Sequence, residues 1–490
     1  MLFNSYEFLF GFLPLVLGGF LFLSRFGLQR PAAAWLGLAS VVFYAWWSPR
    51  YVLLLLGSIA LNYLFGQAIA RRARDRQART GRLLTVAVTA NLALLAYYKY
   101  ANFFIDTARA LSGAALPGLD VVLPIGISFF TFTQIAFLVD CSEAKVQESD
   151  PVHYLLFVTY FPHLIAGPVL HHAEMMPQFA RKDTYRWDLH NVFVGAAFFG
   201  IGLFKKVVLA DGIQPWVGPV FDGGPAPDAL SAWGAALAYT LQLYFDFSAY
   251  SDMAVGLSKL FNVDLPLNFD SPYKARNISD FWRRWHMTLS RFLRDYLYIR
   301  LGGNRHGPTR RHVNLMTTML LGGLWHGAGW TFVIWGGLHG LYLVVNHAWS
   351  AWRSTAGDGD AGPMERVVSH TLTLLAVVVA WVFFRAHTVE DALRVLGGMS
   401  GLAGWAPSGG ADARQWLWIG VLGAVALACP NSQQIVARWL QARDDSATPP
   451  ALAARPGVQW MGLGALLMGC LLLAIVNGSR GVSEFIYFNF

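Results

Sequence analysis

Long apolar stretches alternate with short polar loops along almost the whole chain. A helix needs about 20 mostly apolar residues to cross a hydrocarbon core about 30 Å thick, so these stretches predict membrane spans. The pattern therefore predicts an all-α, polytopic membrane protein with roughly 11–13 membrane segments, supplemented by re-entrant and interfacial amphipathic helices. The expected spans are 8–23, 32–47, 51–70, 83–98, 121–139, 152–166, 192–210, 230–250, 313–325, 330–345, 368–384, 416–428 and 458–476.

Two places interrupt this apolar pattern. The stretch 161–169 contains two prolines and a glycine, which break a regular helix. It forms either a re-entrant element buried in protein or an interfacial loop, and the sequence leaves both open. The second place is the end of the span 230–250, where Asp246, Ser248 and Asp252 follow one another closely. Buried carboxylates need partners, so these residues form either a structural clamp or part of a reaction chamber.

Polarity rises sharply in the region 271–312, which holds ten Lys or Arg and two Asp among several aromatic residues. A helix is expected over 279–301, capped by Ser279 and ended by Gly302 and Gly303. Apolar residues and His286 share one face of that helix, and arginines occupy much of the rest. Such a basic amphipathic helix fits a cytoplasmic interface. It binds anionic lipid, supplies cations to a phosphate-bearing donor such as coenzyme A, or does both.

Composition supports a membrane protein and indicates its orientation. Of 490 residues, 55% are hydrophobic and 13% charged, against about 25% charged in soluble proteins. The net charge of +8 comes from short loops, so it indicates orientation and no nucleic-acid partner. Six arginines in the loop 71–82 predict that this loop is cytoplasmic and that the N-terminus lies outside. Three widely spaced cysteines indicate neither a disulfide framework nor a zinc site.

Two histidines, His326 and His339, lie within the apolar segment 320–340. A buried imidazole tends to stay neutral and can act as a base, although many buried histidines only satisfy a backbone carbonyl. His339 stands near three glycines and is expected to serve close helix packing. The chain has no G-x-S-x-G, P-loop, G-x-G-x-x-G or H-E-x-x-H motif, so neither a metal nor a permanently bound cofactor is expected.

Three motifs give the chain a family resemblance: 281–290 (FWRRWHMTLS), 294–298 (RDYLY) and 324–327 (LWHG). Together they resemble the core signature of the membrane-bound O-acyltransferases. Within that family the chain is similar to the bacterial alginate O-acetyltransferase membrane subunit and its relatives. Further landmarks at 123–129, 161–169, 244–254 and 485–488 follow in the same order, whereas 354–456 carries few.

The resemblance implies an arrangement of the whole chain. Residues 1–490 would form one integral-membrane domain, with core motifs over 120–345, the basic region 271–312 and C-terminal spans over 368–490. A tunnel would connect the two faces, with the family's essential histidine, here His326, near its middle. The resemblance also implies location in the bacterial inner membrane, acetyl-CoA as donor, and periplasmic acetyltransferase or esterase-like partner proteins, besides membrane lipids.

The chemistry expected from this resemblance is acyl transfer from a thioester to a hydroxyl. His326 would act as general base for the attacking hydroxyl. His286, the family's second characteristic histidine, would orient the donor, hydrogen-bond the developing oxyanion, or pack the helix. The further candidates for the donor site or chamber wall are Trp285, Trp325, Arg283, Arg284, Arg294, Asp246, Ser248 and Asp252.

Two alternatives stay open at this stage. The first is a transporter or flippase that moves an acyl group or lipid-linked sugar without catalysis, although the chain shows no internal repeat to support a transporter fold. The second concerns the acceptor of an enzyme, which is alginate, cellulose, another exopolysaccharide or peptidoglycan. A D-alanyl transfer role is a further possibility within the enzyme class.

Overall fold

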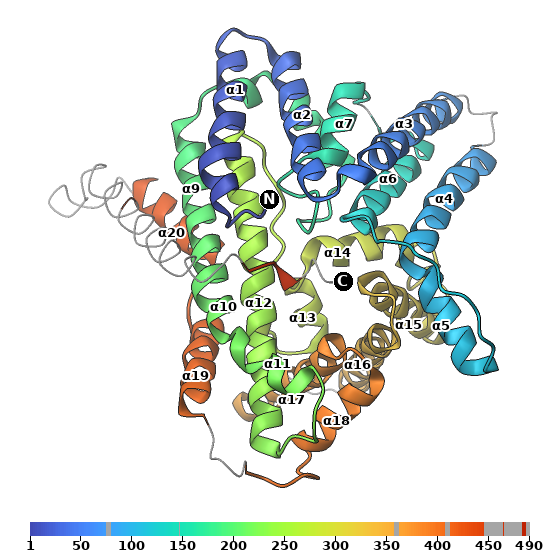
Figure 1. Ribbon diagram of the computed structural model, residues 1–490, viewed down its shortest axis with the longest axis vertical. Helices are drawn as coiled ribbons and strands as arrows, with labels where there is room; N and C mark the ends of the chain where they lie inside the picture. Colours follow the sequence, from blue (N-terminus) through green and yellow to red (C-terminus); the bar gives the residue numbers. More distant parts are fainter. Residues whose placement is uncertain are drawn as a thin grey trace, which may run out of the picture. The chain divides into compact units, whose positions relative to one another are not determined.

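The computed structural model describes residues 1–74, 80–146, 148–356, 362–406, 412–444, 464 and 483–486. Every regular element in these ranges is a helix, shown in Figure 1, so the predicted all-α class is confirmed. The chain divides into two compact units, which are described separately below. The expected span 458–476 lies outside the described residues.

Unit 1 comprises Met1–Gly200 and Asp252–Pro266. In it α1 packs against α2, α2 against α7, and both α3 and α4 against α6. Helix α9 begins in this unit and ends in unit 2, whereas α12 begins in unit 2 and ends in this unit. The helices are α1 (Leu13–Arg25), α2 (Gln29–Trp47), α3 (Val52–Arg74), α4 (Gly81–Leu95), α5 (Ala101–Ser112), α6 (Ile127–Ser142), α7 (Pro151–Thr159), α8 (His172–Ala180), α9 (Leu189–Phe204) and α12 (Ala229–Leu260).

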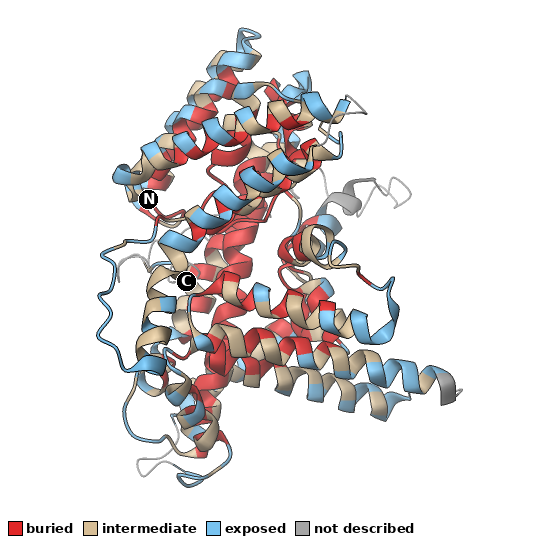
Figure 2. Cartoon of the chain, turned by 90° about the vertical axis from the view of Figure 1, so that its right-hand side faces the viewer, coloured by how far each residue is buried: buried red, intermediate tan, exposed pale blue. Residues whose placement is uncertain are grey.

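Unit 2 comprises Ile201–Ser251 and Leu267–Phe490. Helix α15 packs against α16, α16 against α13 and α17, and α17 against α18. Most of α12 is buried, as the colouring of Figure 2 shows. The remaining helices are α10 (Asp211–Ile213), α11 (Gly218–Phe221), α13 (Ile278–Arg284), α14 (Met287–Phe292), α15 (Gly307–His326), α16 (Trp330–Ala356), α17 (Pro363–Arg385), α18 (Val389–Met399), α19 (Ala413–Ala428) and α20 (Ser432–Asp444).

Several helices in the described ranges are long and apolar enough to cross a membrane. Five meet both conditions, and the pair Ala413–Ala428 and Ser432–Trp439, bent by 53°, would add a sixth if it forms one span. These helices make the protein a multi-pass membrane protein. The expected number of 11–13 segments stays a prediction. The five are Glu7–Arg25, Pro49–Arg74, Gly81–Ser112, Leu189–Phe221 and Pro363–Arg385.

Two predicted spans in unit 1 have wrong helical limits. The helix expected over 121–139 begins only at Ile127, after Gly126 with a positive φ of 71°. A Cβ atom on Gly126 would lie 2.9 Å from the carbonyl oxygen of Leu164, so the residue is also tightly packed. The helix expected over 152–166 ends at Thr159, because Pro162 follows within one turn. Residues 160–170 form irregular, buried backbone, which fits a re-entrant element enclosed by protein.

The single helix expected over 279–301 is also wrong, because the chain forms three shorter pieces. Asn277, not Ser279, caps α13, and its side chain accepts a hydrogen bond from the backbone N–H of Asp280 at 2.9 Å. His286 then takes a left-handed conformation with φ 42° and ψ 53°, which stops the helix before α14. A π-helical turn, Leu293–Tyr298, follows α14. Several apolar residues of this region and His286 are buried, and the region does not form one amphipathic helix.

Candidate active site

His326 is the last residue of α15, and glycines bring this helix against α16. A Cβ atom on Gly323 would lie 2.2 Å from the carbonyl oxygen of Phe332. A Cβ atom on Gly336 would lie 2.3 Å from the carbonyl oxygen of Met319. Only glycine allows the two backbones to approach this closely, as in other tightly packed membrane helices. The glycine crossing of α15 and α16 therefore fixes the backbone position from which the His326 side chain extends.

Aromatic rings surround the His326 imidazole, whose residue is only 5% exposed. The ring centroids of Trp325 and Trp335 each lie 5.0 Å from it, and that of Phe384 lies 5.2 Å away, all at steep angles. These edge-to-face contacts hold the imidazole in a defined orientation. The result is an acid–base group in an apolar cage formed from α15, α16 and α17.

His286 is fully buried, and its ring centroid lies 6.4 Å from that of His326. Its Nδ1 is 3.0 Å from Oδ1 of Asn268. The same oxygen accepts hydrogen bonds from the backbone N–H and the hydroxyl of Thr288, at 3.3 and 2.8 Å. The amide group of Asn268 donates to Ser251 Oγ at 3.3 Å. Asn268 thus ties the left-handed turn at His286 to α12 and α14, although sequence reasoning gave it no role.

These contacts assign the hydrogen on the His286 ring. A backbone N–H can only donate, so the atom of Asn268 that faces Thr288 must be the amide oxygen. His286 Nδ1 must therefore carry the hydrogen and donate to that oxygen. Burial lowers the pKa of His286 to about 3, so the ring is neutral near pH 7. Nε2 of His286 consequently carries a lone pair and accepts hydrogen bonds.

Two further sequence candidates, Trp285 and His339, are packed among aromatic rings of unit 2. Trp285 is buried, with its ring centroid 4.9 Å from that of Trp381 and 5.0 Å from that of Phe269. His339 is also buried, and its Nδ1 accepts a hydrogen bond from Trp282 Nε1 at 3.3 Å. This environment agrees with the packing role expected for His339.

Two of the three arginine candidates, Arg284 and Arg294, form ion pairs with nearby aspartates. Arg284 Nε lies 2.9 Å from a carboxylate oxygen of Asp280. Arg294 Nε lies 2.7 Å from a carboxylate oxygen of Asp295, and its side chain is exposed. Arg283 is exposed. A role for these cations in binding a donor stays a prediction.

Asp246 lies in the middle of α12 instead of near the end of a span, and it is buried. Its Oδ1 is 2.8 Å from Lys206 Nζ, which also lies 2.9 Å from Asp211. Ser248 is buried with its hydroxyl 3.5 Å from the carbonyl oxygen of Phe245, and Asp252 is a buried residue of unit 1. Of the two alternatives for Asp246, the pairing favours the structural clamp. Sequence reasoning missed Lys206, although a lysine within the apolar stretch 192–210 is a recognisable signal.

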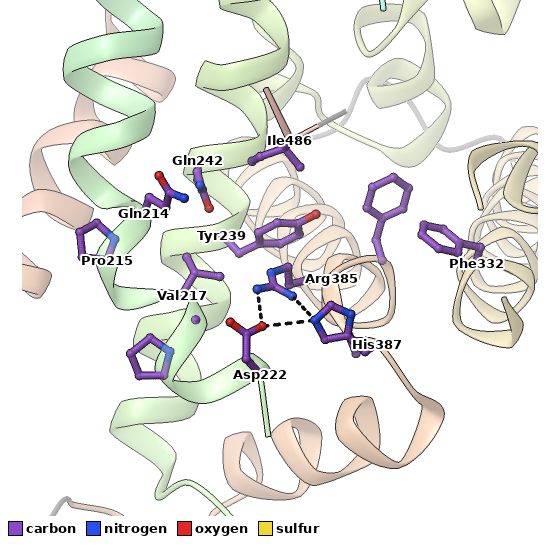
Figure 3. A pocket seen from close by; sticks show the side chains of 14 residues that line it. Gln214, Pro215, Val217, Asp222, Tyr239, Gln242, Phe332, Arg385, His387 and Ile486 are labelled. Carbon is purple, nitrogen blue, oxygen red and sulfur yellow. Dashed lines mark hydrogen bonds and ion pairs between the residues drawn. The ribbon is translucent and has the colours of Figure 1, made fainter. Parts of the chain in front are cut away.

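A pocket of about 680 Å³ adjoins the aromatic cage. Phe384 contributes to the pocket wall and also packs against the His326 ring, so the two spaces share this residue. Figure 3 shows Asp222, Arg385 and His387 at one end of the pocket and Ile486 at the other. The full lining is Gln214, Pro215, Val217, Gly218, Pro219, Asp222, Tyr239, Gln242, Phe332, Phe384, Arg385, Ala386, His387 and Ile486.

Polar groups in this pocket suit a hydroxyl-rich ligand. Arg385 Nη2 and His387 Nε2 lie 2.5 and 3.4 Å from the same oxygen of Asp222. The hydroxyl of Tyr239 is buried, and the described part of the chain offers it no hydrogen-bond partner. Sequence reasoning missed this pocket, although Arg385 and His387 directly follow the apolar stretch 368–384. Among the described residues, no group of three or more His, Cys, Asp or Glu side chains is placed to hold a metal ion.

Known proteins resemble the chain over most of its length. A model of the membrane-bound O-acyltransferase family (MBOAT) matches residues 41–384, which include both site histidines. A peptidoglycan O-acetyltransferase of Helicobacter pylori is 43% identical over 431 residues, covering 82% of this chain and 80% of that protein. A probable alginate O-acetylase of Pseudomonas putida is 41% identical over 414 residues, covering 83% and 81%. A teichoic acid D-alanyltransferase of Streptococcus thermophilus is 29% identical over 245 residues, covering 47% and 58%. The chain therefore belongs to the membrane-bound O-acyltransferase family and is an acyltransferase.

Proposed function

We propose that this enzyme transfers an acetyl group from cytoplasmic acetyl-CoA for the O-acetylation of an extracytoplasmic polysaccharide. The observation that carries the proposal is the position of His326, a titratable ring held in an aromatic cage beside His286 and beside a polar pocket. The names of the Helicobacter pylori and Pseudomonas putida relatives, an O-acetyltransferase and a probable O-acetylase, support acetyl as the transferred group. The proposed location is the bacterial inner membrane.

In the proposed mechanism His326 is the general base. It removes the proton from the acceptor hydroxyl as the hydroxyl oxygen attacks the thioester carbonyl of acetyl-CoA. The tetrahedral intermediate then expels the coenzyme A thiolate and leaves the acetyl ester on the acceptor. The protonated His326 returns its proton to that thiolate, so the histidine ends in its starting form.

The His286 ring is neutral with its hydrogen on Nδ1, and this excludes one of the roles considered for it. Stabilising an oxyanion requires a hydrogen-bond donor, whereas Nε2 of neutral His286 only accepts. We therefore favour a role in which Nε2 of His286 accepts a hydrogen bond from an N–H or hydroxyl group of the acetyl donor and so orients it. Asn268 holds the His286 ring in place. In this proposal His286 does not stabilise the oxyanion.

The pocket provides the proposed approach of the acceptor hydroxyl. Its Asp222, Arg385 and Tyr239 side chains offer both acceptors and donors to a sugar, and Phe384 separates it from His326. The basic region 271–312 is proposed for the opposite, cytoplasmic side, where it meets anionic lipid and the phosphates of the donor. A periplasmic acetyltransferase or esterase-like protein is the proposed partner in the modification of the polymer.

The substitution His326→Ala tests this proposal. Loss of a general base typically lowers the rate about 10² to 10⁴-fold, so acetylation of the polymer should fall to background while abundance in the membrane is unchanged. His190→Ala, which changes an exposed histidine in the first turn of α9, is the matched control and should retain activity. Wild-type acetylation by His326→Ala would exclude His326 as the base. Supplying alginate and peptidoglycan fragments separately to the purified enzyme and its partner distinguishes the two acceptors.

A further inference from the structure

The C-terminal piece Ser483–Ile486 is tied to a buried charge cluster in unit 2, which we call the seat: Lys206, Asp211 and Asp246. Lys206 Nζ donates to the carbonyl oxygen of Glu484 at 2.8 Å. The backbone N–H of Ile486 donates to Asp246 Oδ2 at 2.9 Å, and the Ser483 hydroxyl donates to Asp211 Oδ2 at 2.6 Å. In Figure 1 this red piece of chain lies beside α12.

An aromatic residue strengthens the same attachment. The ring centroid of Phe485 lies 4.8 Å from Lys206 Nζ and 4.9 Å from the ring centroid of Tyr250. Phe485 is almost fully buried, so a cation–π contact and apolar burial accompany the hydrogen bonds. Each of the four residues of the piece therefore contacts a residue of the seat.

The charges of the seat explain why it needs this piece of chain. One lysine faces two aspartates, so the three side chains leave one negative charge in a largely buried site. Buried carboxylates are tolerated when hydrogen-bond donors surround them. Ser483 and Ile486 each supply a donor to one of the two carboxylates. The seat is thus complementary to the C-terminal piece, although more than 230 residues separate them in sequence.

The seat also reaches the candidate active site, because Ile486 lines the pocket whose wall includes Phe384. We propose that Lys206 and Asp246 are positioning residues that hold Ile486 in place as part of the wall of the acceptor pocket. The pocket's role as acceptor site rests on the proposed function; the attachment of the C-terminal piece does not. The proposal gives the buried Asp246 carboxylate a role in shaping the pocket wall instead of a role in proton transfer.

A labelling experiment measures the attachment directly and needs no catalysis. Ile486→Cys is introduced into the full chain with its three native cysteines replaced by alanine, and the rate of reaction with a soluble maleimide is followed. Lys206→Met should raise that rate about tenfold or more, because it removes charge-assisted hydrogen bonds that hold the piece closed. Lys205→Met is the matched control, since its Nζ lies 5.8 Å from the ring centroid of Tyr244, and it should leave the rate near that of the parent.

Kinetics then tests the consequence for the pocket. With acetyl-CoA as donor and alginate oligosaccharide or peptidoglycan fragments as acceptor, Lys206→Met and Asp246→Asn should raise the acceptor KM about tenfold and change kcat little. Phe485→Ala should do the same, and combining it with Lys206→Met should add little, because both changes release one piece of chain.

The outcomes separate the two proposals. Unchanged labelling in both Lys206→Met and Phe485→Ala would overturn the seat, whatever the activity. Faster labelling with unchanged acceptor KM would overturn its role in the pocket. If Lys206→Met is labelled faster but the wild-type enzyme shows no acetyl transfer, the proposed function is rejected and the attachment of the C-terminal piece still stands. If Lys206→Met does not accumulate, the labelling rate of Phe485→Ala alone tests the attachment, because this substitution changes only the C-terminal piece.

Discussion

Asn268→Ala is the most informative change near the two histidines that leaves both of them in place. The side-chain oxygen of Asn268 accepts hydrogen bonds from His286 Nδ1, from the Thr288 backbone N–H and from the Thr288 hydroxyl. The hydroxyl can rotate toward another acceptor, but the other two donors keep their directions. A buried donor that loses its acceptor costs about 1–3 kcal/mol, so the expected loss of folding free energy is about 2–6 kcal/mol. That is a large part of the roughly 5–15 kcal/mol by which proteins are usually stable.

The assay is the temperature at which the detergent-purified enzyme loses its monodisperse form, together with its acetyl-transfer rate. Thr288→Val serves as the graded control, because it removes one hydroxyl and should cost only about 0.5–1.5 kcal/mol. Asn268→Ala should therefore be clearly less stable than Thr288→Val and should lose activity, since the His286 ring is no longer held. An Asn268→Ala enzyme as stable as Thr288→Val or more stable would refute the assigned hydrogen bonds.

Two further changes test the helix crossing and the pocket. Gly336→Ala should lower thermal stability and activity, because its Cβ atom would lie 2.3 Å from the carbonyl oxygen of Met319; Gly337→Ala should be tolerated, with its Cβ atom 3.6 Å from Leu320. Equal stability of the two variants in a heating experiment would contradict the crossing. Tyr239→Phe should leave stability unchanged within about 0.5 kcal/mol, because its hydroxyl has no partner in the described chain, and should raise the acceptor KM. An unchanged KM would remove this hydroxyl from the acceptor site.

Part of the fold and of the site could be predicted from sequence because the responsible signals are local. Apolar stretches located most helices, and the short motifs correctly indicated the family. The glycines of 320–340 suggested close helix packing, which the crossing of α15 and α16 confirms. The roles of His326 and His286 in catalysis remain proposals.

The features that were missed depend on distant residues or on backbone conformation. Hydrophobic periodicity carries no signal for the left-handed backbone of His286, so the break between α13 and α14 was not foreseen. The partner of Asp246 lies 40 residues earlier in sequence, and a pattern cannot pair two such charges. The pocket is assembled from five separated parts of the chain, which no single motif describes.

The glycine crossing also constrains how a molecule reaches His326. Since the backbones of α15 and α16 touch, neither helix can shift against the other by rearranging side chains at that point. The rings of Trp335 and Phe384 lie against the imidazole, so a molecule that approaches past them has to displace these rings. Access of a molecule to the His326 imidazole then depends on the side-chain torsion angles of one or two aromatic residues.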